Sequence, residues 1–170
     1  NVVNPDDYVS KYGADVVRAF LMFIGPWEMG GPWNPRAIEG VNRFLHRVWS
    51  LVVDPPQKSG GGAPTVRQIA DLRRATHQTI QKVSEDYQTF KFNTMIAALM
   101  GFSNTLAEAK ETPLVGAPAW DEAISTLLLL MAPAMPHITE ELWSRMGRAY
   151  SIHTHPWPVA DPTLAKADMV

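Results

Sequence analysis

Residues 38–53 read IEGVNRFLHRVWSLVV, and the spacing of their apolar side chains predicts a long amphipathic helix. Apolar residues recur at intervals of three, four and one, as one face of an α-helix requires. This stripe comprises Ile38, Val41, Leu45, Val48, Trp49 and Val52. A helix with one apolar face has to bury that face against other elements, so the stretch predicts a packed helical domain.

The flanks of this stretch contain start and stop signals. Asn34-Pro35 is a capping residue followed by a proline, which suits the first helical turn. The two prolines at 55–56 end the helix, since neither can donate a backbone hydrogen bond. Residues 58–64 contain three consecutive glycines and are typical of a flexible linker.

Similar patterns predict further helices on both sides. We expect them at residues 5–12, 14–24, 66–87, 93–109 and 120–146. Pro133 and Pro136 divide the last stretch into two helices and set the angle between them. The tail after Gly147 has no helical period, and a short strand is expected near Ser151-Ile152. The predicted fold is all-α, an antiparallel helical bundle with a small helical piece at its N-terminus.

Composition excludes several classes of function. The chain has 170 residues, 46% of them apolar, as a folded domain requires. It contains no cysteine, so disulfides, thiolate metal sites and thiol nucleophiles are excluded. The net charge of −2 is unlike the strongly basic charge of many nucleic-acid binders.

The longest apolar run, 127–134, is too short to span a bilayer. The first residues do not form a signal peptide, and we expect both ends to be cuts within a longer chain.

No constellation for catalysis is found. The glycines at 60–62 are not followed by Lys and Ser or Thr, so they do not form a phosphate-binding loop. His137 with Glu140 and Glu141 resembles half of a metal site, but a bundle site needs such pairs from several helices. We therefore predict no metal and no catalytic residue. Glu140 and Glu141 are expected to face water, and His137 to satisfy the backbone after Pro136.

Basic side chains remain as binding candidates. They lie on the helix expected from Pro35 to about Val53 and on the next one, and comprise Arg36, Arg43, Arg47, Arg67, Arg73, Arg74 and Lys82. Arginine binds phosphate through two parallel hydrogen bonds, so these cations are candidates for one RNA-binding groove. The alternative is a solvated helix face with ion pairs such as Arg36 or Arg43 with Glu39.

Several motifs together resemble the leucyl-tRNA synthetases. Residues 1–18 are similar to the segment that follows the KMSKS loop in class I synthetases, with Asn1 as the asparagine that closes that signature. Residues 21–33 and 38–49 look like the leucine enzymes specifically, and residues 92–100 resemble their bundle helix. Ala132-Pro133 with the stretch 136–143 is similar to a signature shared by related class I enzymes. Residues 151–158 resemble the family's exit segment, although His155 stands where the family commonly has glutamine.

The resemblance implies a three-part organisation. Residues 1–34 would form a stem-contact piece, 35–150 an anticodon-binding-type helical bundle, and 151–170 an exit segment toward a C-terminal domain. The family attaches leucine to its tRNA using ATP, with magnesium, in the cytoplasm. The catalytic, editing and C-terminal domains would lie outside these residues, leaving no cofactor in this chain and no membrane partner. Leucine enzymes are thought not to rely on anticodon bases, so the tRNA would be held by its stem and backbone.

Two other interpretations remain open at this point. The first is a free-standing helical interaction module in which Trp120, Trp143 and Trp157 form a docking patch. The second is the equivalent bundle of an isoleucine or valine synthetase, although residues 25–27 and 43–49 favour the leucine enzyme. It is also open whether Trp27 and Trp33 pack within the chain or against absent domains.

Overall fold

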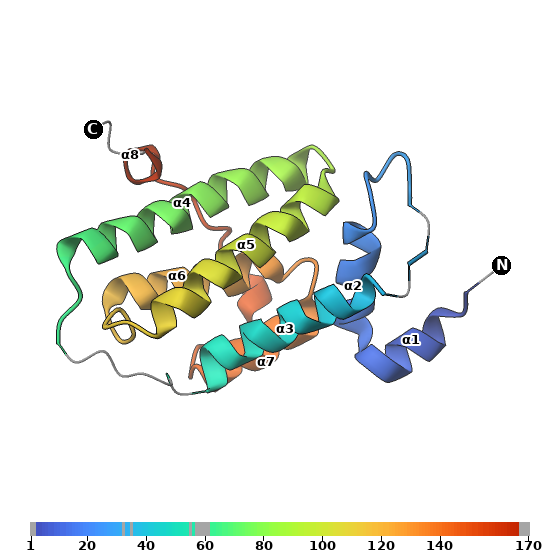
Figure 1. Ribbon diagram of the computed structural model, residues 1–170, viewed down its shortest axis with the longest axis horizontal. Coiled ribbons are helices and arrows are strands. Elements are labelled where there is room, and N and C mark those ends of the chain that lie inside the picture. Colours follow the sequence, from blue (N-terminus) through green and yellow to red (C-terminus); the bar gives the residue numbers. More distant parts are fainter. Residues whose placement is uncertain (1–2, 32, 35, 55, 57–61, 167–170) are drawn as a thin grey trace.

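A computed structural model describes residues 3–31, 33–34, 36–54, 56 and 62–166, and every regular element within them is helical (Figure 1). In chain order the elements are α1 (Pro5–Tyr12), α2 (Ala14–Phe23), α3 (Ile38–Val53), α4 (Val66–Gln88), α5 (Phe92–Lys110), α6 (Pro118–Met131), α7 (Pro136–Arg145), the 3-10 helix η1 (Ile152–Thr154) and α8 (Pro162–Ala165). The predicted all-α fold is confirmed. Pro35 and Pro55, and most of the linker expected at 58–64, fall outside the described residues.

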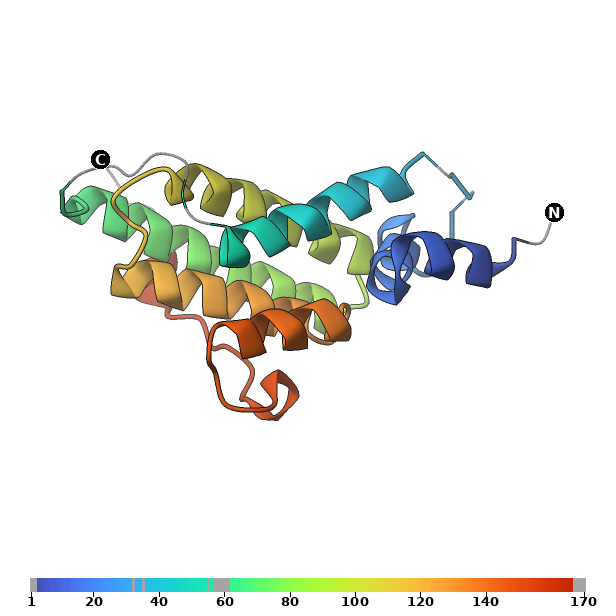
Figure 2. The same ribbon diagram turned by 90° about the horizontal axis from the view of Figure 1, so that it is seen from below.

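Helix α5 is the centre of the bundle. It packs between α3 and α4 and also contacts α2 and α6, while α7 packs on α3 and α6 (Figures 1 and 2). Helices α1 and α2 lie at one end of the molecule, and α8 rests on α4 at the other (Figure 1). A binding surface that included both α3 and α4 would therefore have to cross α5.

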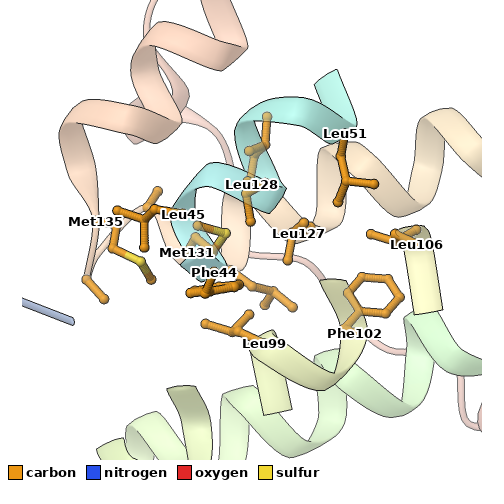
Figure 3. Packing of buried hydrophobic residues seen from close by; sticks show 14 of the residues in the cluster. Phe44, Leu45, Leu51, Leu99, Phe102, Leu106, Leu127, Leu128, Met131 and Met135 are labelled. Atoms are coloured by element: carbon orange, nitrogen blue, oxygen red, sulfur yellow. The ribbon is translucent and has the colours of Figure 1, made fainter. Parts of the chain in front are cut away.

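The hydrophobic core fills the space between α3, α5 and α6. Side chains from these three helices point toward one another, among them Phe44, Leu99 and Leu127 (Figure 3). Phe20 of α2 is also fully buried in this core, so the N-terminal helices share it with the bundle. Burying each such side chain contributes roughly 1.5–3 kcal/mol, which is what holds the amphipathic helices together.

Capping side chains stabilise the starts of several helices. The Asn4 side chain accepts a hydrogen bond from the Asp6 N–H at 3.1 Å, with Pro5 in the first turn. Thr65 and Gln68 form a reciprocal capping box at the start of α4. Helix α3 begins at Ile38, three residues later than predicted, because Asn34 accepts from the Arg36 N–H at 3.0 Å and residues 36–37 form a turn.

The strand predicted near Ser151-Ile152 is wrong. Residues Ile152–Thr154 form a 3-10 turn, and the Ser151 hydroxyl caps it by accepting from the His153 N–H at 3.2 Å. The buried Ile152 side chain and a carboxylate of α7 hold this turn in place. Alternation of residue types over so short a segment does not decide between extended and turn backbone.

Candidate functional site

The seven predicted binding cations lie on two helices that face different neighbours. Arg43 and Arg47 project from α3, and Arg36 lies in the turn before it. Arg67, Arg73, Arg74 and Lys82 project from α4. Because α5 packs between α3 and α4, the structure brings these residues together only as two groups, one on each side of α5 (Figure 1).

The α3 group leaves its charge uncompensated. Arg43 is exposed, and its guanidinium extends back over Gly40. Within the described residues no carboxylate pairs with Arg36, Arg43 or Arg47, and Glu39 instead accepts the Tyr12 hydroxyl at 2.5 Å. Arg47 donates to the Ser103 hydroxyl of α5 at 3.1 Å, which fixes its side chain along the boundary between the two helices. The ion pairs of Glu39 considered from the sequence are therefore wrong.

The α4 group is compensated by carboxylates. Asp71 pairs with Arg74 at 2.8 Å and with Arg67 at 3.7 Å. Lys82 pairs with the buried carboxylate of Asp86 at 2.8 Å, and the Thr94 hydroxyl donates to the other oxygen of Asp86. These carboxylates lower the local positive charge, and each cation would have to exchange a carboxylate for a phosphate, so we expect weaker phosphate binding on α4 than on α3.

Arg73 belongs to a partly buried network in which only His77 is buried. It shares the carboxylate of Glu122 on α6 with His77, at 2.9 Å from Arg73 and 3.2 Å from His77. The Nδ1 of His77 accepts the backbone N–H of Asp161 at 3.0 Å. A backbone N–H can only donate, so Nδ1 carries no proton here and Nε2–H donates to Glu122. Arg73 therefore helps to join α4, α6 and the tail.

The C-terminal tail covers one face of α4. The Trp157 indole N–H donates to the Ser84 hydroxyl at 2.8 Å, and its ring packs edge-on against Tyr87 at 5.4 Å. Further along, the Gln78 amide donates to the Ala165 carbonyl at 2.9 Å, and Arg74 donates to the Lys166 carbonyl at 3.2 Å. The tail thus runs along α4 toward the start of that helix and occupies Arg74.

A set of hydrogen bonds, which we call the clamp, joins two of the sequence motifs, the one over residues 1–18 and the one around Pro133 and Pro136. It was not anticipated from the sequence. The carboxylate of Asp15 on α2 accepts the Ile138 N–H at 2.7 Å and bonds the His137 Nδ1 at 2.8 Å. Arg18, one turn later, donates to the carbonyls of Ala134 and Pro133 at 2.9 and 3.1 Å. The free backbone groups at the proline-rich corner are therefore satisfied by α2. The prediction that His137 performs this role is wrong, since Asp15 does so.

Glu140 does not face water, contrary to the prediction from the sequence. Its carboxylate is half-buried and accepts the Ser151 hydroxyl and the Ile152 N–H at 3.1 Å, so it ties the start of the tail to α7. Glu141 is exposed and pairs with Arg145, as a water-facing side chain can. Two adjacent glutamates on a helix point in different directions, and only packing decides which one is covered.

A cleft of about 500 Å³ lies beside the clamp, where residues 12–16 meet α3 and α7. Leu45 and Trp49 form its apolar wall, and Asn42 and His46 lie on its α3 side.

Across the described residues, no group of three or more His, Asp or Glu side chains is placed to hold a metal ion. Within that same part of the chain, no helix combines the length and the hydropathy that a membrane span requires.

The comparisons with known proteins agree with this architecture. The family described as "Anticodon-binding domain of tRNA ligase" matches residues 70–169. The chain belongs to this family. Leucine–tRNA ligases are among the curated relatives of this anticodon-binding domain. Those of Herpetosiphon aurantiacus and Deinococcus radiodurans are 52% and 45% identical over 96% and 100% of the chain.

The chain spans about a fifth of the length of these relatives, since its match covers 20% of each. Among solved structures it is similar to the crystal structure of the ternary complex LeuRS-tRNA-LeuAMS of Agrobacterium radiobacter K84 agnB2. That match has a TM-score of 0.78 and 30% sequence identity, and covers 98% of this chain and 22% of the other. The identity of the relatives confirms the leucyl-tRNA synthetase resemblance and disfavours the isoleucine and valine alternatives.

The tryptophans exclude the proposed three-residue docking patch. Trp143 is 4% exposed and donates its indole N–H to the Ala149 carbonyl, so it cannot lie on a shared surface with Trp120 and Trp157. Trp33 packs within the chain, edge-on against Phe20 at 5.0 Å. Trp27 is 60% exposed. The two tryptophans of the loop after α2 therefore have different environments.

Proposed function

We propose that this anticodon-binding domain is the tRNA-docking region of a leucine–tRNA ligase, with α3 as the principal contact. The observation that carries the proposal is the exposed and unpaired Arg43 beside Arg47, on a helix whose carboxylate Glu39 is occupied elsewhere. Support also comes from relatives that are leucine–tRNA ligases and from a structural neighbour solved with tRNA. Leucine tRNA is the proposed RNA partner.

The mode of docking follows from the distribution of charge. Arginine side chains hold phosphates through paired hydrogen bonds, and such contacts set the position of an RNA without reading its sequence. The net charge of −2 argues against broad electrostatic attraction, so the contact depends on a few uncompensated cations. The α4 cations Arg67, Arg73, Arg74 and Lys82 remain candidates, but each has a carboxylate partner to exchange.

The chemistry of leucylation is proposed to lie outside these residues, in catalytic and editing regions of a longer, cytoplasmic enzyme. We assign no catalytic step to this chain. The isolated chain is expected to show no leucine-dependent exchange of pyrophosphate into ATP. An exchange signal from the purified chain would refute this assignment.

Fluorescence anisotropy tests the docking function. The purified chain is mixed with labelled leucine tRNA and with one non-cognate tRNA, at low and at physiological salt. Circular dichroism confirms that the sample is folded. We expect salt-sensitive binding with little discrimination between the two tRNAs, since phosphate contacts dominate. A folded chain that binds neither tRNA at low salt would overturn the proposal and leave the helices as a scaffold.

A further inference from the structure

An exposed aromatic surface lies where the loop after α2 meets the corner between α4 and α5. Phe92 is its base, with the rings of Trp27 and Phe90 each 5.4 Å from it, centroid to centroid. Trp27 and Phe90 are both 60% exposed, and Met29, in the same turn as Trp27, is 84% exposed. We call Trp27, Met29 and Phe90 the aromatic patch. Clusters of this kind on a soluble domain mark interaction sites.

The loop that carries Trp27 and Met29 has a defined shape. The Gly30 N–H and the Met29 N–H both donate to the Pro26 carbonyl at 3.0 Å. Gly25 and Gly31 lie so close to opposing backbone that a Cβ on either would approach a carbonyl oxygen to 2.8 or 2.7 Å. The glycines thus permit a closed turn, and that turn presents two large apolar side chains to the outside.

Phe90 occupies a position where glycine is the usual residue. Its φ of +57° is left-handed, and the Lys91 N–H donates to the Asp86 carbonyl at 2.9 Å, which is the helix-ending arrangement that glycine favours. A bulky side chain in this conformation is disfavoured. Within the described residues its ring gains one edge contact, with Phe92, and stays mostly exposed. The backbone conformation of Phe90 is unfavourable for a bulky residue, and its ring gains little packing within the described residues. This combination indicates that the ring contacts something outside these residues.

The composition of the patch favours protein over RNA. Platforms for RNA bases combine aromatic rings with a cationic track. The charged neighbours of the patch in sequence, Glu28 and Lys91, carry one charge of each sign. Aromatic residues and methionine are enriched at the centres of protein interfaces, where charged residues are depleted.

We propose that the aromatic patch is the interface with the part of the ligase chain that precedes residue 1. The relatives are about five times longer than this chain, so most of the enzyme lies outside it. The patch is at the end of the molecule that carries α1, whereas α8 lies at the opposite end (Figures 1 and 2). The loop of the patch is also joined to α1, because Trp33 donates its indole N–H to the Tyr8 hydroxyl at 3.3 Å. This inference needs only the family membership and is independent of the proposed RNA docking.

Site-specific photocrosslinking in the full-length ligase tests it. A benzophenone amino acid replaces Met29, whose exposed side chain has little packing to lose, and crosslinked peptides are identified by mass spectrometry. The matched control carries the same probe at Val159, which is 85% exposed and lies on the tail. We expect crosslinks from position 29, without tRNA present, to residues that precede residue 1.

Every other pattern from position 29 counts against the proposal. When tRNA is added in a parallel reaction, crosslinks to tRNA alone would make the patch an RNA contact, and in either reaction crosslinks to a second copy would make it an oligomer interface. Crosslinks to segments after residue 170, or none above the yield of the Val159 control, would also overturn it. A failure here leaves tRNA affinity untouched, so it is distinguishable from a failure of the docking function.

A second variant separates the ring of Phe90 from its backbone. Phe90→Gly suits the left-handed conformation, so the corner itself is retained. We expect the crosslink yield from position 29 in the full-length ligase to fall several-fold, because part of the interface is removed. An unchanged yield would show that Phe90 does not belong to the interface and would overturn the patch as defined.

Discussion

Helices α3 and α4 both flank α5, and both carry several cations, yet their charges are arranged differently. On α3 the side chain of Arg43 is unpaired within the described residues, and Arg47 is held by a neutral hydroxyl. On α4 the cations face Asp71, Asp86 and Glu122, and the tail covers part of the helix. The number of basic residues on a helix therefore does not measure its capacity to bind phosphate. The carboxylates within reach decide that capacity.

The strongest test of this contrast reverses the charges on α3. We expect Arg43→Glu with Arg47→Glu to weaken binding of leucine tRNA about ten- to a hundredfold near physiological salt, and to lower the salt slope by about 1.5, since two phosphate contacts are lost. Anisotropy titrations at several salt concentrations measure both quantities. Unchanged affinity in a folded double variant would remove α3 as the principal contact.

The role of the carboxylates that face the α4 cations is tested by Glu122→Ala on α6. This change removes the acceptor shared by Arg73 and the buried His77, so we expect the free energy of unfolding to fall by about 1–3 kcal/mol. Urea denaturation followed by circular dichroism gives the value. Glu141→Ala is the control, because its pair with Arg145 is exposed and is worth about 0.5 kcal/mol or less. Equal stability of the two variants would show that the network on α4 is not structural.

Charge reversal on α4 tests whether its paired cations contribute less to tRNA binding than those of α3. We expect Arg67→Glu with Arg74→Glu to change tRNA affinity by less than about threefold, since both cations already pair with Asp71. The measurement is the same anisotropy titration as for the α3 pair. A loss as large as that of the α3 variant would break the contrast between the two helices.

The smallest expected effect concerns the tail on α4. Hydrogen bonds from the Thr163 side chain, and then from its backbone N–H, lower the pKa of Asp161, which caps α8. Because the folded pKa is depressed, the cap stabilises α8 at pH values above the ordinary aspartate pKa of about 3.9 and is lost as the pH falls through the lowered value.

Nuclear magnetic resonance can follow this step through the Thr163 amide. We expect its shift to be constant near neutral pH and to titrate with a midpoint below about 3.9. The Leu128 amide, in the buried part of α6, is the reference for unfolding of the bundle. A Thr163 midpoint at or above the ordinary aspartate value would contradict the cap, as would an unchanged titration in Asp161→Asn.

Most of the fold was predictable from the sequence because its signals are local. The Thr65 cap marks the start of α4, and Pro136 marks the start of α7. The apolar period of residues 38–53 identifies most of the buried face of α3, although Phe44 and Leu51 are buried where Trp49 and Val52 were predicted to be. The short turn at Ile152–Thr154 was not predictable, because its cap and its Glu140 partner matter more than residue preference.

Of the candidate site, the sequence predicted which cations exist but not how they are used. On a helical wheel, Arg43 and Arg74 occupy similar positions, since each lies outside the apolar face of its helix. The pair of Arg74 with Asp71 follows from helical spacing, but only folding brings the Lys166 carbonyl to Arg74 and engages Glu39 with Tyr12, away from Arg43. The clamp was likewise hidden, because Asp15 and Ile138 are 123 residues apart in the chain.

The order of residues along the chain accounts for the helical period, the caps, the proline breaks and the membership in a family. Packing of the helices was needed to bring Glu122 to Arg73, to leave Trp27 exposed while Trp33 is packed, and to place α2 where it satisfies the backbone between α6 and α7. The physical reason is that hydrogen bonds and ion pairs act over a few ångströms in space. The sequence distance between their partners places no limit on them.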